Sequence, residues 1–447
     1  MMLEAVKKEI DSYREQFAAF EREAGDRGPI GVRSLRKEAF HHFAEQGFPT
    51  TRDEDWKYTN LSPLTRLELG TQGEDHLQAS DLERLRFGDL GCPRLTFVNG
   101  RFSEALSTLD QMPEGVEVKR LSQALENEPE VVEEHVGRHA EYEGKPFTAL
   151  NLAFLHEGAF LRVAPNTVVE KPVQILYLST EKAQDGVSHP HNLVLVGENS
   201  QFKFVENYSC LGQARYFNNV VSEVVVGDNA VVDHFKIEME SLQAFHVNRT
   251  AVYQGRTSNY RNFFVAFGGS IVRNDMNTVL DGEGSHCGLD GLFVTREKQL
   301  VDSFTVMDHA QPNCDSREVY KGILDDHSRG VFHGRIIVRQ KAQKTDSKQS
   351  SDNLLLSDNA LVNTKPQLEI YADDVKCTHG ATIGQLDEEG LFYLRSRGIP
   401  EDAARGLMIY AFASEVLSRV SYKPLRERLL DYMAEWLPNG ELVREAE

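Results

Sequence analysis

The chain has 447 residues, of which 69 are acidic and 49 are basic, so its formal charge is −20 at pH 7. This charge disfavours binding to nucleic acids and to anionic membrane surfaces. Hydrophobic residues make up 40% and charged residues 26% of the chain, as in an ordinary soluble protein, and the length suits two or three domains.

We expect neither a secretory signal at the N-terminus nor a segment that spans a membrane. Residues 1–9 are charged and lack the apolar core of a secretory signal, and no run of about 18 apolar residues is present. The five cysteines are odd in number and widely spread, which indicates reduced thiols and not a disulfide framework. We therefore expect a cytoplasmic protein that binds neither membranes nor nucleic acids.

Residues 1–150 predict a mainly helical N-terminal domain. Apolar residues recur at three- and four-residue spacing over 6–20 and 32–48, and another helix is expected over 121–139. Residues 95–102 predict a β-hairpin, because their Asn-Gly pair suits the positive φ angles of a tight turn. The polar segment 52–60 is interpreted as a helix start whose two aromatic side chains pack inward.

From about residue 150, short β-rich runs replace the helical pattern, and we expect a β core over 151–394. A turn rich in Gly, Asp and Asn returns at intervals of roughly 30 residues. Its copies are 165–167, 197–200, 227–230, 255–258, 282–285, 325–328 and 357–360. Such a repeat is typical of a solenoid, in which coils stack and one turn stays at one corner. A β-sandwich with regular turns is the alternative.

Residues 395–447 predict a C-terminal helical domain. Pro400, Glu401 and Asp402 suit the first turn of one helix, and Pro424 suits the start of a second. Both predicted helices carry an apolar stripe. We expect them either to cap the open end of the solenoid or to form a docking surface.

The pair Cys377 and His379 is the strongest candidate for chemistry. Side chains two residues apart on a strand share a face, about 7 Å apart. Because Leu368, Ile370 and Ala372 alternate with polar residues, we expect these three to face inward and the Cys–His pair to face outward. The alternative is a buried thiol beside a structural histidine.

A thiol and an imidazole are suitable ligands for iron or an iron–sulfur unit, but a soft metal usually needs four such donors. No second pair lies nearby in the sequence, so a partner chain would have to complete the site. The sequence contains no phosphate-loop motif and no C-x-x-C, H-E-x-x-H or G-x-S-x-G motif, so hydrolysis of ATP by a phosphate loop is not indicated.

Six segments resemble the scaffold family of the SUF iron–sulfur cluster assembly system, SufB/SufD. They are 317–322, 328–336, 342–346, 353–357, 366–377 and 391–399. Residues 377–382 and 56–59 are similar to the SufD branch in particular. The resemblance implies a mainly β fold, a right-handed parallel β-helix flanked by N-terminal and C-terminal helical regions.

The same resemblance implies a role and partners. The chain would be a non-catalytic scaffold in a complex with SufB and the ATPase SufC, which would dock on the C-terminal helices; in isolation it could form a homodimer. A nascent iron–sulfur cluster or iron would lie at the SufB–SufD contact, with His379 as a ligand and Cys377 as its neighbour. The family complex is also associated with a reduced flavin.

Two other functions remain open from the sequence. One is a partner-binding structural solenoid with no metal role. The other is a carbohydrate-active β-helix enzyme, but its best acidic pair, Asp373 and Asp374, is adjacent and would point apart on a strand.

Overall fold

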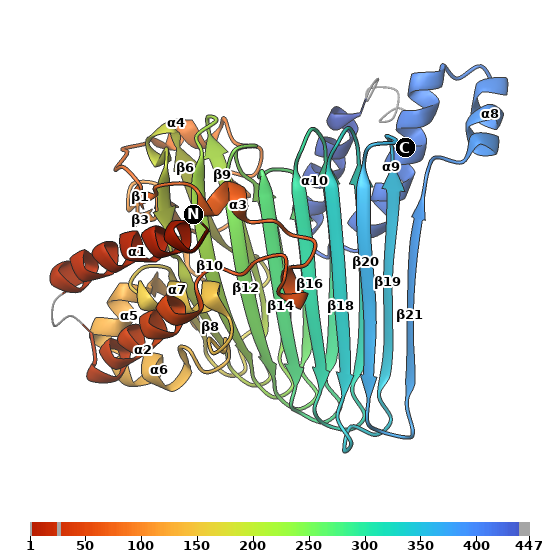
Figure 1. Ribbon diagram of the computed structural model, residues 1–447. Coiled ribbons are helices and arrows are strands. Elements are labelled where there is room, and N and C mark those ends of the chain that lie inside the picture. Colours follow the sequence, from red (N-terminus) through yellow and green to blue (C-terminus); the bar gives the residue numbers. More distant parts are fainter. Residues whose placement is uncertain (1, 25–27, 438–447) are drawn as a thin grey trace.

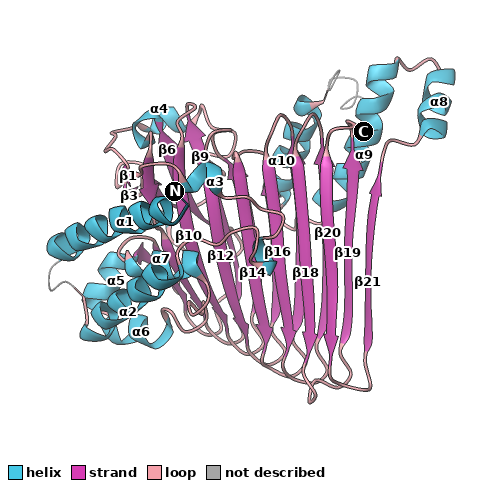
Figure 2. Ribbon diagram, in the orientation of Figure 1, coloured by secondary structure: helices cyan, strands magenta, loops and turns pink. Residues whose placement is uncertain are grey.

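The computed structural model describes residues 2–24 and 28–437 as a parallel β-solenoid with helices at both ends (Figures 1 and 2). From β8 onward, successive strands alternate between two sheets, so each strand pairs in parallel with the strand two places later. This arrangement confirms the predicted solenoid.

Sheet A contains the strands β4 (Val116–Arg120), β5 (Ala159–Val163), β8 (His191–Val196), β10 (Tyr216–Val226), β12 (Phe245–Gln254), β14 (Ile271–Leu280), β16 (Leu300–His309), β18 (Arg329–Val338) and β20 (Leu361–Ile370). Two short strands, β1 (Gly70–Thr71) and β7 (Gly186–Ser188), join its side. Sheet B contains β3 (Arg101–Phe102), β2 (Arg94–Val98), β6 (Val173–Thr180), β9 (Gln201–Leu211), β11 (Val231–Met239), β13 (Asn259–Ala266), β15 (His286–Thr295), β17 (Asp315–Leu324), β19 (Asp346–Leu355) and β21 (Lys376–Gly384).

The recurrent turns lie at two corners of each coil, not at one. In the turns that lead from sheet A to sheet B, Asn166, Asn199 and Asn229 have positive φ angles, and each amide side chain bonds to the next at 3.1 Å. Asparagine tolerates this left-handed conformation better than most residues, which explains the sequence signal. The turns at 325–328 and 357–360 lead from sheet B to sheet A, so the predicted series wrongly joined two different corners.

The N-terminal region contains α1 (Met2–Ala24), α2 (Ile30–Gln46), η1 (Glu54–Trp56), α3 (Ser62–Thr65), α4 (Ala79–Leu82), η2 (Leu109–Gln111), α5 (Leu121–Asn127), α6 (Pro129–His135) and α7 (Pro146–Ala153); the short η3 (Glu181–Ala183) follows β6. The predicted hairpin is present, with positive φ at Asn99 and Gly100. The helix expected over 121–139 is two helices, because Pro129 starts a new one. Trp56 is buried as expected, whereas Tyr58 is 40% exposed.

The C-terminal helices are α8 (Glu388–Ser396), α9 (Glu401–Leu417) and α10 (Lys423–Trp436), and residues 438–447 lie outside the described residues. Ile409 of α9 and Leu425 of α10 share a buried cluster with Phe235, Phe263 and Leu292 of sheet B. These helices therefore cover a wall of the solenoid, and the expectation that they cap its open end is wrong. The part of the outer face of sheet B that lies beneath these helices is apolar, so it needs this cover.

Strand β11 is amphipathic, but its apolar side chains point outward and its polar side chains point inward, opposite to an ordinary surface strand. Phe235 and Ile237 point out toward the C-terminal helices. The alternate residues His234, Lys236 and Glu238 are completely buried on the interior side. The solenoid thus holds charged side chains in its interior, where burial is costly unless they are paired.

Candidate functional site

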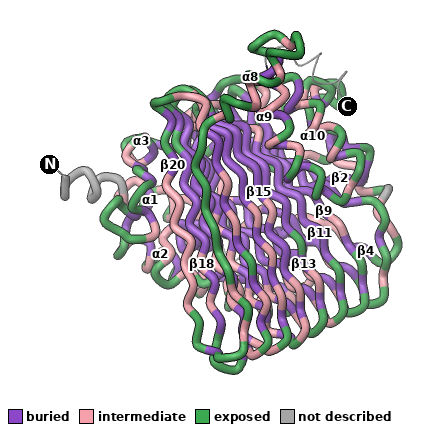
Figure 3. Tube along the Cα trace, turned by 90° about the vertical axis from the view of Figure 1, so that its right-hand side faces the viewer, coloured by how far each residue is buried: buried purple, intermediate pink, exposed green. Residues whose placement is uncertain are grey.

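The two strands β20 and β21 form an open end of the solenoid. Each is the last strand of its sheet, so one backbone edge of each has no neighbouring strand in the described chain. Leu361, Ile370 and Ile383 on these strands are 45%, 39% and 50% exposed. Figure 3 views this end, where exposed and half-buried strands lie in front of buried ones. An unpaired edge of this length is a template for pairing with another chain.

Both predicted site residues lie on β21 at this open end. Cys377 is in register with Ser347 of β19, and His379 is in register with Gln349. Cys377 is half-buried and packs against the interior apolar cluster, whereas His379 is exposed. Because residues two apart share a face, both side chains lie on the interior side of the coil, at its mouth.

The expectation that this pair faces outward is therefore wrong. Leu368 and Ala372 do pack against the interior, as predicted. The error came from treating 368–380 as one strand, because β20 ends at Ile370 and the turn at 371–375 leads into the other sheet. That turn resets the alternation of side chains, so Cys377 returns to the inside.

A row of polar side chains continues from Cys377 into the solenoid. Cys287, Ser316, Ser347 and Cys377 occupy the same register position on four successive strands of sheet B. Ser316 Oγ lies 2.7 Å from Ser347 Oγ and 2.9 Å from His309 Nε2. This row was not predicted, although each member is the second residue of its strand, a shared position that indicates alignment across the coils.

The neighbouring row ends at His379. Gln349, in register with His379, donates a 2.6 Å hydrogen bond to the buried Glu318 carboxylate. Burial raises the pKa of Glu318 to about 7. A polar interior therefore lies directly behind both candidate ligands.

Burial also raises the pKa of the Cys377 thiol; the nearby Asp346 adds to the effect, and a hydrogen bond with the Ser347 backbone opposes it. Burial lowers the pKa of His309 to about 4, so its imidazole is neutral at pH 7. Cys377 is thus held as a thiol, and it becomes a ligand only when a bound metal displaces its proton.

This chain alone supplies an incomplete donor set. Among the described residues, neither Cys377 nor His379 belongs to a group of three His, Cys, Asp or Glu side chains close enough to share an ion. A soft metal site usually has four donors. Any metal held here therefore needs ligands from outside the described chain.

The other thiols occupy positions that suit packing. Cys287 is buried in the interior cluster, while the adjacent His286 pairs with Asp315 on the other side of the strand. Cys314 is completely buried, with its sulfur 3.3 Å from Ser285 Oγ. The acidic pair is equally unsuited to catalysis, because Asp374 lies in the turn before β21 and is paired with Lys344.

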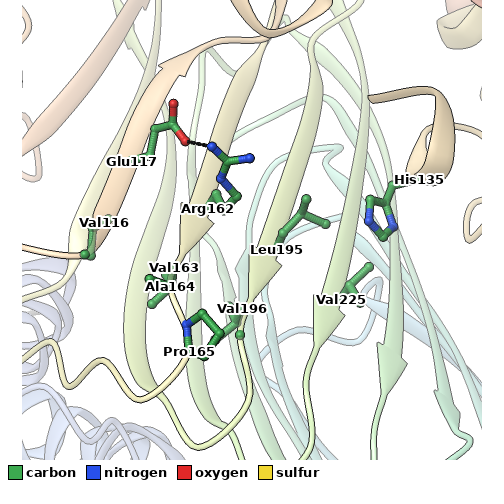
Figure 4. A pocket seen from close by; sticks show the side chains of 12 residues that line it. Val116, Glu117, His135, Arg162, Val163, Ala164, Pro165, Leu195, Val196 and Val225 are labelled. Atoms are coloured by element: carbon green, nitrogen blue, oxygen red, sulfur yellow. Dashed lines mark hydrogen bonds and ion pairs between the residues drawn. The ribbon is translucent and has the colours of Figure 1, made fainter. Parts of the chain in front are cut away.

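A pocket of about 610 Å³ lies at the opposite end of the solenoid (Figure 4). Val116, Leu195 and Val225 give it a mainly apolar lining, and Glu117 pairs with Arg162 at 2.5 Å at its side. Its lining contains no cysteine. It is therefore separate from the Cys–His pair and offers no thiol donor.

Comparison with known proteins identifies the family of the chain. Residues 178–412 match the family described as "SUF system FeS cluster assembly, SufBD core domain", and residues 7–175 match "SufBD protein N-terminal region". The chain is 31% identical to the iron–sulfur cluster assembly protein SufD of Escherichia coli, over 94% of this chain and 96% of that protein. It is also 31% identical to an iron–sulfur cluster assembly SufBD family protein of Synechocystis, over 95% and 94%. SufD of Bacillus subtilis is 27% identical, over 90% and 93%.

The described part of the chain contains no helix with the length and apolarity needed to cross a lipid bilayer.

Proposed function

The chain belongs to the SufBD family of iron–sulfur cluster assembly proteins, and from this premise we propose that it is a non-catalytic scaffold subunit of a complex with SufB and SufC. In this role it supplies His379, with Cys377 beside it, to a nascent cluster or iron that is cargo and not a resident cofactor. The supporting observation is the placement of two metal donors next to an unpaired sheet edge.

The open end explains why a partner is needed. A chain that pairs with the edges of β20 and β21 brings its own side chains to the mouth where Cys377 and His379 lie. SufB is the partner that we propose for this contact, and a second copy of this chain is the partner in isolation. Pairing would satisfy the free backbone groups and cover Leu361 and Ile383.

The C-terminal region is the surface that we propose for SufC. Phe392 and Tyr393 of α8 are 72% and 57% exposed, and none of the residues in α8 is buried. Beside them, a pocket of about 490 Å³ is lined by charged residues that include Arg395 and Arg405. Exposed aromatic side chains next to charged ones are typical of protein contact sites. The reduced flavin that the resemblance implies for the complex stays a prediction.

The test of the cluster role is a His379→Ala variant co-expressed with SufB and SufC. We expect the three-chain complex to form normally, because an exposed side chain contributes little to packing. Iron and acid-labile sulfide per complex should fall. His327→Ala is the matched control, since His327 is also an exposed histidine of the solenoid.

The competing function is a structural solenoid that binds partners without holding metal. The exposed apolar residues of the open end favour partner binding whether or not metal is held there. If the His379→Ala complex assembles clusters at the rate and yield of the His327→Ala complex, the structural role is correct and the ligand role is wrong.

A further inference from the structure

A second group of metal-binding side chains lies deep inside the solenoid, well away from the open end. Glu238 ends the interior row of β11, Glu240 lies in the corner that follows, and His246 is the second residue of β12. Five strand steps separate β11 from β21 in sheet B, or about 24 Å along the solenoid axis. The group is therefore independent of Cys377 and His379.

The geometry of these three side chains is that of a preformed donor set. One nitrogen of His246 and one oxygen of each carboxylate all lie within 4.8 Å of one another. His246 Nδ1 is 2.9 Å from Glu240 Oε2 and 3.4 Å from Glu238 Oε2. Ligand atoms about 2.1 Å from a tetrahedral ion lie about 3.4 Å apart, so an ion fits after a shift of about 0.5 Å at Glu240.

One carboxylate of the group lacks a hydrogen-bond donor among the described residues, and its near neighbour is His246 Nδ1 at 3.4 Å. Within the described part of the chain, neither carboxylate oxygen of Glu238 has a hydrogen-bond partner, although its side chain is 0% exposed. A buried carboxylate without a partner is costly and calls for an explanation. Its oxygen next to His246 Nδ1 faces the space between the three side chains.

The other carboxylate is held in position by a second layer of hydrogen bonds. The side-chain amide nitrogen of Asn218 donates to Glu240 Oε1, and its side-chain oxygen Oδ1 accepts from Gln72 and Ser188. Such an outer layer is typical of metal ligands, whose orientation it fixes.

The charges of the surrounding interior point to a divalent cation. Three carboxylates, those of Glu206, Glu238 and Glu240, are buried with one ammonium group, that of Lys236. If all of them ionise and the neighbouring histidines are neutral, two negative charges remain.

We propose that Glu238, Glu240 and His246 bind one divalent transition-metal ion inside the solenoid. One imidazole nitrogen with two carboxylate oxygens is a mixed donor set, which suits Fe²⁺, Mn²⁺ or Zn²⁺. It suits Ca²⁺ and Mg²⁺ less well, because these ions prefer ligands that are all oxygen. The ion neutralises the excess negative charge of the buried carboxylates. This site does not depend on the function proposed for the open end.

The test uses the full chain with Cys377→Ala and His379→Ala, so that metal at the open end cannot contribute. The protein is expressed with added Zn²⁺, desalted and assayed for zinc by mass spectrometry. We expect about one zinc ion per chain, and a drop in occupancy of at least about tenfold when Glu238→Gln or His246→Gln is added. Glu318→Gln is the matched control, because it changes another buried interior glutamate and should leave the zinc content unchanged.

Thermal unfolding separates loss of metal from loss of fold. In the presence of a chelator that removes metal, Glu238→Gln should unfold at the same temperature as its parent or higher. The reason is that the substitution removes a buried carboxyl that lacks a hydrogen-bond donor. Added Zn²⁺ should raise the unfolding temperature of the parent but not of Glu238→Gln. Co²⁺ loaded into the parent should give visible absorption that the Glu238→Gln variant lacks. A parent chain without zinc, or equal zinc in the parent and Glu238→Gln, would overturn the proposal.

Discussion

Cys377 lies directly beside Ser347 in the register of the last parallel strand pair, and Ser347 Oγ lies 2.7 Å from Ser316 Oγ. The thiol is therefore the outermost member of an interior polar row, and it does not stand on the outer wall of the solenoid. A ligand bound to Cys377 would meet the partner on one side and this polar interior on the other.

The reactivity of Cys377 should reflect this half-buried position. Because burial and Asp346 raise its pKa, we expect its alkylation by iodoacetamide to be slower at pH 7.5 than that of an exposed cysteine. The rate should keep rising at pH values where an ordinary thiol has reached its plateau. Asp346→Asn should shift this profile to lower pH, since it removes a negative charge near the thiolate.

Peptide mass spectrometry of the labelled native protein measures these rates. The completely buried Cys287 and Cys314 serve as internal controls and should react more slowly than Cys377 at every pH. A Cys377 rate that reaches its plateau near pH 7 would contradict the assignment of a protonated thiol.

Glu318 should make the protein less stable as the pH rises. Its carboxyl has a pKa of about 7 in the folded chain, against an ordinary value of 4.5. Between these two values the unfolded chain ionises while the folded chain stays protonated, so stability falls as the pH rises from 4.5 to 7 and then levels off. The difference corresponds to a loss of about 3 kcal/mol at pH 8.

Glu318→Gln removes this effect while it keeps the shape of the side chain. We expect the variant to unfold at a higher temperature than the parent at pH 8 and at a similar temperature near pH 4.5, as measured by differential scanning fluorimetry. A constant difference across this range would show that Glu318 is ionised in the folded protein.

A charge at the open end should block partner pairing. Ile383 is 50% exposed on β21, so Ile383→Lys should leave the unfolding temperature of the isolated chain nearly unchanged. A lysine on an edge strand opposes pairing with another strand. We expect weaker association with SufB, and a smaller dimer fraction for the isolated chain, in size-exclusion chromatography with light scattering.

Val168→Lys is the matched control for this substitution. Val168 is 64% exposed near the other end of the solenoid, where it forms an isolated bridge with Gln201. Association that both substitutions weaken equally would place the contact elsewhere.

The aromatic pair on α8 should decide the binding of SufC. Phe392→Ser together with Tyr393→Ser removes exposed apolar surface, so we expect the complex to lose SufC while it keeps SufB. Affinity capture followed by quantitation of each chain measures this. Ile30→Ser, at a residue that is 74% exposed on α2, is the control.

Point substitutions are a better test here than deletion of everything after residue 398. Such a deletion would remove α9 and α10, whose residues Ile409 and Leu425 cover the apolar outer face of sheet B. Loss of SufC could then reflect a damaged solenoid. Retention of SufC by the Phe392 and Tyr393 double variant would rule out this surface.

The sequence favoured a solenoid over the alternative β-sandwich, because turns such as those at Asn199 and Asn229 mark a corner where the backbone takes a positive φ angle. The sequence was not sufficient to predict which face of a strand a side chain occupies once the chain has passed a corner. Cys377 and His379 do lie two residues apart on one strand, but the turn at 371–375 reversed the face on which they lie, and their role as ligands stays a prediction.

The interior metal-binding group was missed for a related reason. In β11, polar and apolar residues alternate as they would on a surface strand, so Glu238 would ordinarily be assigned to solvent. Because α9 and α10 cover the apolar face, the polar face lies inside. His246 lies on the next strand, after a corner of the coil. Its position beside Glu238 is set by the way the coils stack, which the local sequence pattern does not show.

The two ends of the solenoid differ in one respect that limits how the chain can assemble. At the N-terminal end, the sheets finish in short antiparallel strands, the two-residue β3 and the five-residue β4, whereas β20 and β21 present ten and nine residues of free edge. If both ends of the solenoid had long free edges, molecules could pair at both ends and would join into a filament. With a single long edge among the described strands, we expect each molecule to join end to end with one partner only, so that growth stops at a pair.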